Sequence, residues 1–128
     1  METKRYSGWL VEQDWGEGMD VLWLKDGDEP IAQLIANDMD DHGPYLSVRY
    51  FVSDNEASLE QAQEAWLRTL FGASDANVGH AYSEFTGYLW TDEEINVGGH
   101  DLIAELHSHV GKYLNLEIEY SPSEVAAR

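Results

Sequence analysis

The chain has 128 residues, which is the size of one ordinary domain. Its 25 acidic and 7 basic residues give a formal net charge of -18 at pH 7, and a field of that sign repels phosphate backbones and anionic membranes. The chain contains no cysteine, so disulfides and thiolate metal sites are excluded.

The composition predicts a folded protein in spite of the charge. Apolar residues make up 43% of the chain, with 5 Trp, 7 Tyr and 3 Phe among the aromatics. No continuous apolar segment long enough for a membrane span is present, and we expect a cytoplasmic protein. One domain over residues 1–120 is predicted, followed by a flexible tail over residues 121–128.

The first half of the chain has the alternating pattern of β-strands. Residues 6–13 predict a strand, and residues 21–24 and 31–35 flank Asp26-Gly27, a dipeptide typical of tight hairpin turns. In residues 45–53, Leu46, Val48, Tyr50 and Val52 share one face, which predicts a further strand. Together these segments predict a four-stranded antiparallel meander.

The second half alternates helices and strands. Ser58 and Gln61 have the spacing of a capping box, which predicts a helix that ends near Gly72. A strand over residues 82–91, a helix over residues 101–110 and a strand over residues 114–120 follow. The expected fold is α+β in the order ββββαβαβ, with a mainly antiparallel sheet of about six strands and two helices packed on one face.

A metal site is the first chemical possibility, because His100, His107 and His109 lie close in sequence. In a helix, however, His107 and His109 point to nearly opposite sides, and His100 and His107 lie roughly 10 Å apart along the axis. We therefore predict no metal and no cofactor.

Other catalytic patterns are weak or missing. Gly98-Gly99 before a helix could bind an anion, but Asp101 occupies the first turn and no Lys or Arg is near. No nucleophile motif is present, so the chain is predicted to be non-enzymatic.

Acidic residues interleaved with aromatic ones are the remaining feature. Aromatic side chains anchor interfaces, and carboxylates around them speed encounter with basic partners. Trp23, Tyr50 and Trp66 are expected in the core and Trp15 on the surface. The predicted partner-binding residues are Trp15, Glu17, Asp38, Asp40, Asp41, Tyr88, Trp90, Asp92, Glu93 and Glu94.

In size, charge and lack of a catalytic motif, the chain resembles the small acidic inhibitors carried by phages and mobile elements, such as anti-CRISPR and DNA-mimic antirestriction proteins. The resemblance implies a binder that occupies the basic, nucleic-acid-binding surface of a host protein. Its carboxylates would then take the place of phosphates and release the same counterions. Such a protein would be a monomer or a weak homodimer and would not bind nucleic acid itself.

Three alternatives stay open at this point. An immunity protein that neutralises a basic nuclease toxin would have the same charge. A small enzyme or metal-binding protein could be built around His100 and His107. An acidic surface is also typical of proteins from a salt-adapted cytoplasm.

Overall fold

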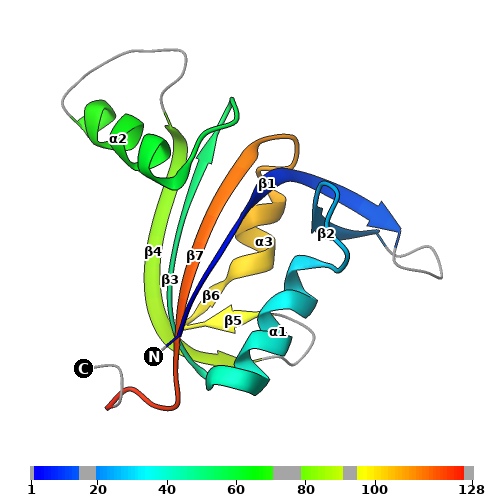
Figure 1. Ribbon diagram of the computed structural model, residues 1–128, viewed down its shortest axis with the longest axis vertical. Coiled ribbons are helices and arrows are strands. Elements are labelled where there is room, and N and C mark those ends of the chain that lie inside the picture. Colours follow the sequence, from blue (N-terminus) through cyan, green and yellow to red (C-terminus); the bar gives the residue numbers. More distant parts are fainter. Residues whose placement is uncertain (1, 15–19, 71–78, 91–94, 126–128) are drawn as a thin grey trace.

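The computed structural model describes residues 2–14, 20–70, 79–90 and 95–125 (Figure 1). Within these residues the elements follow the order ββαβαβββαβ. They are β1 (Glu2–Asp14), β2 (Asp20–Leu24), α1 (Ile31–His42), β3 (Tyr45–Ser53), α2 (Leu59–Leu70), β4 (Gly79–Trp90), β5 (Asn96–Val97), β6 (His100–Asp101), α3 (Leu102–His107) and β7 (Tyr113–Ser121).

The seven strands form one curled sheet in the order β2-β1-β7-β3-β4-β5-β6 (Figure 1). Each neighbouring pair is antiparallel. The α+β class and the mainly antiparallel sheet are therefore confirmed. The counts were wrong, because the described residues contain seven strands and three helices where six and two were expected.

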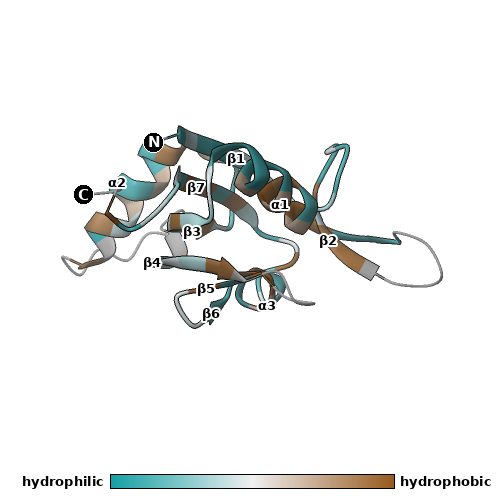
Figure 2. Cartoon of the chain, turned by 90° about the horizontal axis from the view of Figure 1, so that it is seen from below, coloured by the Kyte–Doolittle hydropathy of each residue, from teal (hydrophilic) through white to brown (hydrophobic). Residues whose placement is uncertain are grey.

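The main core lies on the face of the sheet that α1 and α3 cover. Alternate residues of the two central strands supply much of it: Leu46, Val48, Tyr50 and Val52 from β3, and Leu114, Leu116, Ile118 and Tyr120 from β7. Ile31 and Ile35 of α1 and Leu102 and Leu106 of α3 pack against them. The predicted face of residues 45–53 is confirmed. Hydrophobic and hydrophilic residues are interspersed along α1 (Figure 2), as in a helix that packs one side on a core.

A smaller core lies on the opposite face, under α2. Phe51 points away from Tyr50 and Val52 because successive side chains of a strand alternate. There it packs with Leu59, Ala62, Trp66 and Tyr82. The predicted capping box is confirmed, since the Ser58 amide donates to Gln61 Oε1 at 2.9 Å and the Gln61 amide donates to Ser58 Oγ at 3.1 Å. The C-terminal end of α2 is exposed, with Leu70 65% exposed.

The predicted strand over residues 31–35 was wrong, because this segment begins α1. The Asp26-Gly27 turn forms as expected, with Asp26 at φ 67°, but it leads into a helix. Buried Ile31 and Ile35 are one helical turn apart, and Pro30 precedes the helix, where a missing amide proton does no harm. Five residues read alone were ambiguous between strand and helix.

This error also makes the four-stranded meander wrong. α1 carries the chain across the sheet, so β3 does not pair with β2 and β7 lies between β1 and β3. The expectation that both helices share one face was wrong as well. α2 packs on one face, whereas α1 and α3 pack on the other (Figure 1).

The segment around Gly98-Gly99 forms the turn between β5 and β6, so it does not directly precede a helix. A Cβ on Gly98 would lie 2.2 Å from the Thr86 carbonyl oxygen, and its φ of +57° also favours glycine. The helix that follows is shorter than the predicted 101–110. Asp101 caps α3 by accepting a hydrogen bond from the Ala104 amide at 3.0 Å.

The predicted tail starts inside β7. Ser121 is the last residue of β7 and is buried. A Cβ on Gly43, which follows α1, would lie 2.4 Å from the Ser121 carbonyl oxygen. The backbone amide of Glu124 donates to the Tyr88 hydroxyl at 3.2 Å. Residues 121–125 thus contact both the end of α1 and β4.

Candidate functional site

Five carboxylates gather on α1 and on the turn before it. We call them the α1 acidic surface: Asp26, Asp28, Glu29, Asp40 and Asp41. Asp26, Asp28 and Glu29 lie near the start of α1, and Asp40 and Asp41 lie in its last turn. The two ends of the helix are about 18 Å apart along its axis. In the described part of the chain, none of the five forms an ion pair with a basic side chain. The sequence explains this, because no Lys or Arg lies between Lys25 and Arg49.

The polar side chains along α1 form a connected row. Asn37 Nδ2 donates to Glu29 Oε2 at 3.1 Å, and Gln33 Nε2 donates to Asn37 Oδ1 at 2.8 Å. Asp40 and Asp41 continue this exposed row into the last turn of the helix. The negative end of the helix dipole lies there, so these two carboxylates disfavour the helix. Helix stability therefore does not account for their presence.

Asp38 is not part of this surface, although it was predicted to bind the partner. Its carboxylate accepts hydrogen bonds from the hydroxyls of Tyr6 and Tyr120 between α1 and the sheet. Burial, together with the neighbouring Asp38 charge and hydrogen bonds, raises the pKa of both tyrosines. Asp38 thus holds α1 on the sheet.

Tyr88 lies on the other face of the sheet from α1. It pairs in register with Tyr45, and the two rings meet edge to face with their centroids 5.0 Å apart. The structure therefore does not bring Tyr88 together with Asp40 and Asp41.

The remaining predicted partner-binding residues are not assigned to the α1 acidic surface. Trp15, Glu17, Asp92, Glu93 and Glu94 lie outside the described residues. Trp90 is described only through its backbone, which pairs with Asn96.

His100 and His107 do not share a site. His100 Nδ1 lies 2.9 Å from Glu105 Oε2, and the His100 ring stacks on Phe85 with the centroids 4.3 Å apart. His107 Nε2 instead lies 2.6 Å from Glu12 Oε1. Over the described ranges, no three His, Asp or Glu side chains are arranged to hold a metal ion.

Glu105 joins His100 to a buried tyrosine. The Tyr50 hydroxyl donates to Glu105 Oε1 at 2.9 Å, and burial followed by this hydrogen bond raises the pKa of Tyr50 to about 12. Catalytic histidines are oriented in the same way, by a carboxylate that hydrogen-bonds one nitrogen of the imidazole ring. The sequence did not indicate this arrangement, because Tyr50 and Glu105 are far apart along the chain.

An alternating row of charges crosses the α2 face of the sheet. Glu117 of β7 accepts from Arg5 of β1 and from Arg49 of β3, each with an N···O distance of 2.8 Å. Burial alone would raise the pKa of Glu117, but the hydrogen bonds from the two arginines outweigh it and lower the pKa below its usual value. Two of the seven basic residues are thus engaged by one carboxylate.

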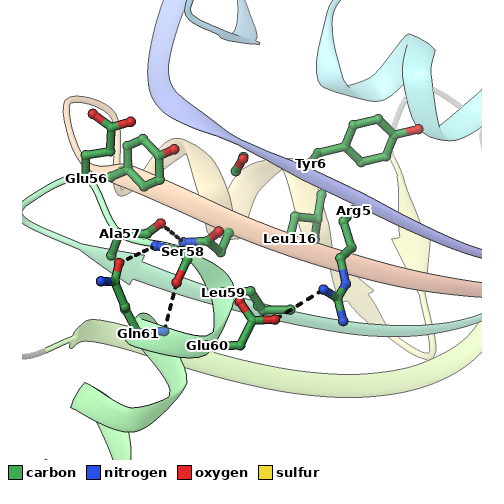
Figure 3. Close-up of a pocket in the computed structure, with 12 residues that line it drawn as sticks. Arg5, Tyr6, Glu56, Ala57, Ser58, Leu59, Glu60, Gln61 and Leu116 are labelled. Carbon is green, nitrogen blue, oxygen red and sulfur yellow. Dashed lines mark hydrogen bonds and ion pairs between the residues drawn. The ribbon is translucent and has the colours of Figure 1, made fainter.

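A pocket of about 430 Å³ lies beside this row, between strands β1 and β7 and the segment that leads into α2 (Figure 3). Arg5 borders it from β1, and Glu56, Ser58 and Glu60 border it from the other side (Figure 3). Asn115 Nδ2 fastens the two walls by donating to the Ala57 carbonyl oxygen at 2.9 Å. The volume falls in the range of small-ligand pockets. No sequence motif pointed to this pocket, because its walls come from three separate segments.

No protein-family model, curated protein or solved structure matches this chain. Among the described residues, no helix combines the length and the apolar character that crossing a bilayer requires.

Proposed function

We propose that this protein is a non-enzymatic acidic binder that occupies the basic, nucleic-acid-binding surface of another protein. The observation that carries the proposal is the α1 acidic surface, whose five carboxylates have no basic partner among the described residues. Asp40 and Asp41 add negative charge where the helix dipole is already negative. A role in recognition accounts for charges that folding does not need.

The net charge of the chain also supports binding to a basic protein surface. A surface that carries uncompensated carboxylates attracts basic proteins over distances of about a Debye length and repels nucleic acid. The composition without cysteine suits a protein that meets its partner in the cytoplasm, acting as a monomer or weak homodimer. This is the behaviour of small acidic inhibitors of phages and mobile elements, and an immunity protein against a basic nuclease would use the same physics.

The proposal is tested by capture followed by competition. The chain is immobilised, proteins retained from a bacterial lysate are identified, and each purified candidate is assayed for release of a bound DNA duplex. We expect the chain to displace the duplex and the affinity to fall steeply as salt rises, because ion pairs with displaced counterions dominate binding. The identity of the captured protein separates an inhibitor of nucleic-acid processing from an immunity protein.

Two charge-matched variants make the test specific. Asp40→Asn with Asp41→Asn removes two charges from the α1 acidic surface, whereas Glu2→Gln with Glu64→Gln removes two exposed charges elsewhere. We expect the first variant to bind more weakly, with a shallower salt dependence, and the second to bind nearly as the wild type does. Equal loss in both variants, or binding that ignores salt, would show the proposal to be wrong.

A further inference from the structure

The pocket between β1, β7 and the start of α2 contains polar groups that the fold leaves unused. Tyr113 and Asn115 line it and are only 9% and 4% exposed. Asn115 uses its Nδ2 to bind Ala57, but no described residue donates to its Oδ1 or contacts the Tyr113 hydroxyl by a hydrogen bond. Neither oxygen is fully enclosed, so both keep contact with solvent. Two side chains that are largely buried thus keep an oxygen that no described residue binds, beside the pocket that they line.

The charges around the pocket favour a cation over an anion. Arg5 is the one basic residue of its lining, and it already contacts Glu117 at 2.8 Å and Glu60 at 3.4 Å. Glu56 and Glu60 also line the pocket, and Glu56 forms no ion pair with any described residue. The lining therefore carries a net charge of about -1 within a chain of -18. An anionic ligand would have to displace a carboxylate from Arg5.

We infer that this pocket binds the guanidinium group of an arginine side chain that the basic partner presents. A guanidinium is planar and carries five N–H donors, so it can donate to the Tyr113 and Asn115 oxygens together. Its positive charge complements Glu56, a lining residue that forms no ion pair with any described residue. The inference rests on the proposed function for the source of the arginine, and it adds a specific pocket to a charge-based recognition.

The pocket and the α1 acidic surface lie on different faces of β1. The pocket is on the α2 face, whereas α1 lies on the face where Tyr6 meets Asp38. A partner that inserts an arginine into the pocket therefore need not cover the α1 acidic surface at the same time. The two contacts can be tested separately.

The pocket is tested with N-acetyl-L-arginine amide as the probe and N-acetyl-L-citrulline amide as its uncharged analogue. Both are titrated into the intact chain and followed by two-dimensional NMR. We expect the arginine compound to shift the backbone amides of Ser58, Leu59 and Glu60 and the side-chain amide of Asn115. The citrulline compound should bind at least several-fold more weakly. Equal binding of the two compounds, or shifts away from these groups, would overturn the inference.

Hydroxyl deletions supply a matched pair of variants. Tyr113→Phe keeps the ring, which packs edge to face on Trp9, and removes only the pocket hydroxyl. We expect roughly a five-fold weaker affinity for the arginine compound, the loss typical of one hydrogen bond. Tyr45→Phe removes a hydroxyl outside the pocket and should leave the affinity unchanged. An unchanged affinity in Tyr113→Phe, with Glu56→Gln also unchanged, would contradict the inference.

Further outcomes distinguish free arginine from an arginine side chain as the ligand. They also distinguish failure of the pocket inference from failure of the proposed function. Tighter binding of free L-arginine than of the blocked compound would overturn a protein side chain as the ligand. Capture of a basic partner through Asp40 and Asp41, without any binding of the arginine compound, would overturn the pocket and support the proposed function. The reverse result would support the pocket as a guanidinium site and overturn the proposed function.

Discussion

The hydroxyl of Tyr6 in β1 donates a hydrogen bond to the carboxylate of Asp38 in α1. Tyr120 of β7 donates to the same carboxylate at 3.3 Å. One acidic side chain thus receives two uncharged donors from two neighbouring strands. These contacts fix α1 over the sheet without any basic residue.

Replacing Asp38 tests this role. Asp38→Ala leaves two partly buried hydroxyls without their acceptor, so we expect the free energy of unfolding to fall by about 1–3 kcal/mol. Chemical denaturation measures the change. The exposed Asp41→Ala should change it by about 0.5 kcal/mol or less. Similar effects of both replacements would mean that Asp38 does not anchor α1.

The tyrosines predict a loss of stability in alkali. The pKa values of Tyr50 and Tyr82 are raised from 10.0 to about 12, first by burial and then by their hydrogen bonds to Glu105 and Glu84. Their contribution is complete below pH 10, where both states hold the proton, and it is lost as the pH rises toward 12 because the unfolded chain releases the proton first. Denaturation curves across this range should show the fall. Tyr50→Phe should make it shallower, whereas Tyr45→Phe should not.

Glu117 predicts a loss of stability in acid. Its pKa lies below the ordinary value of 4.5 in the folded chain, so its contribution is present above pH 4.5 and is lost as the pH falls through the folded pKa. Glu117→Gln should lower the free energy of unfolding at neutral pH by about 1–3 kcal/mol and flatten its dependence on pH in acid. Glu119→Gln, two residues along β7, is the control. A pH dependence that stays the same in Glu117→Gln would refute the role of the arginine contacts.

The capping box predicts the effect of a single hydroxyl. Ser58→Ala removes the acceptor of the Gln61 amide at the start of α2, and we expect a loss of about 1 kcal/mol in the free energy of unfolding. Thermal or chemical denaturation measures it. Gln63→Ala, at an exposed position within α2, should be nearly neutral, and an equal loss there would contradict a capping effect.

Local patterns were sufficient for several elements of the fold. The alternation in residues 45–53 and 114–120 and the capping box at Ser58 were each confirmed, because each pattern depends on neighbours along the chain. The helix at Ile31 was missed because a run of five mostly apolar residues after a turn fits a strand equally well. Pairing between β3 and β7 could not be predicted, since it depends on where α1 directs the chain.

The candidate surfaces follow the same division. The acidity of residues 26–41 could be predicted because no basic residue interrupts them. The inward direction of Asp38 could not, since it is set by hydroxyls of Tyr6 and Tyr120 from distant strands. The pocket was missed for a similar reason, because Tyr113, Asn115 and Ser58 meet only in the folded chain.

The hydrogen bonds from tyrosine hydroxyls to carboxylates affect how the folded protein responds to salt. Asp38, Glu84 and Glu105 are each satisfied by a tyrosine, whose neutral hydroxyl leaves the carboxylate charge intact. Electrolyte weakens attraction between opposite charges far more than it weakens a bond from a neutral donor. The fold can therefore stay intact at salt concentrations that dissociate a complex held by ion pairs. Release of the partner need not involve unfolding.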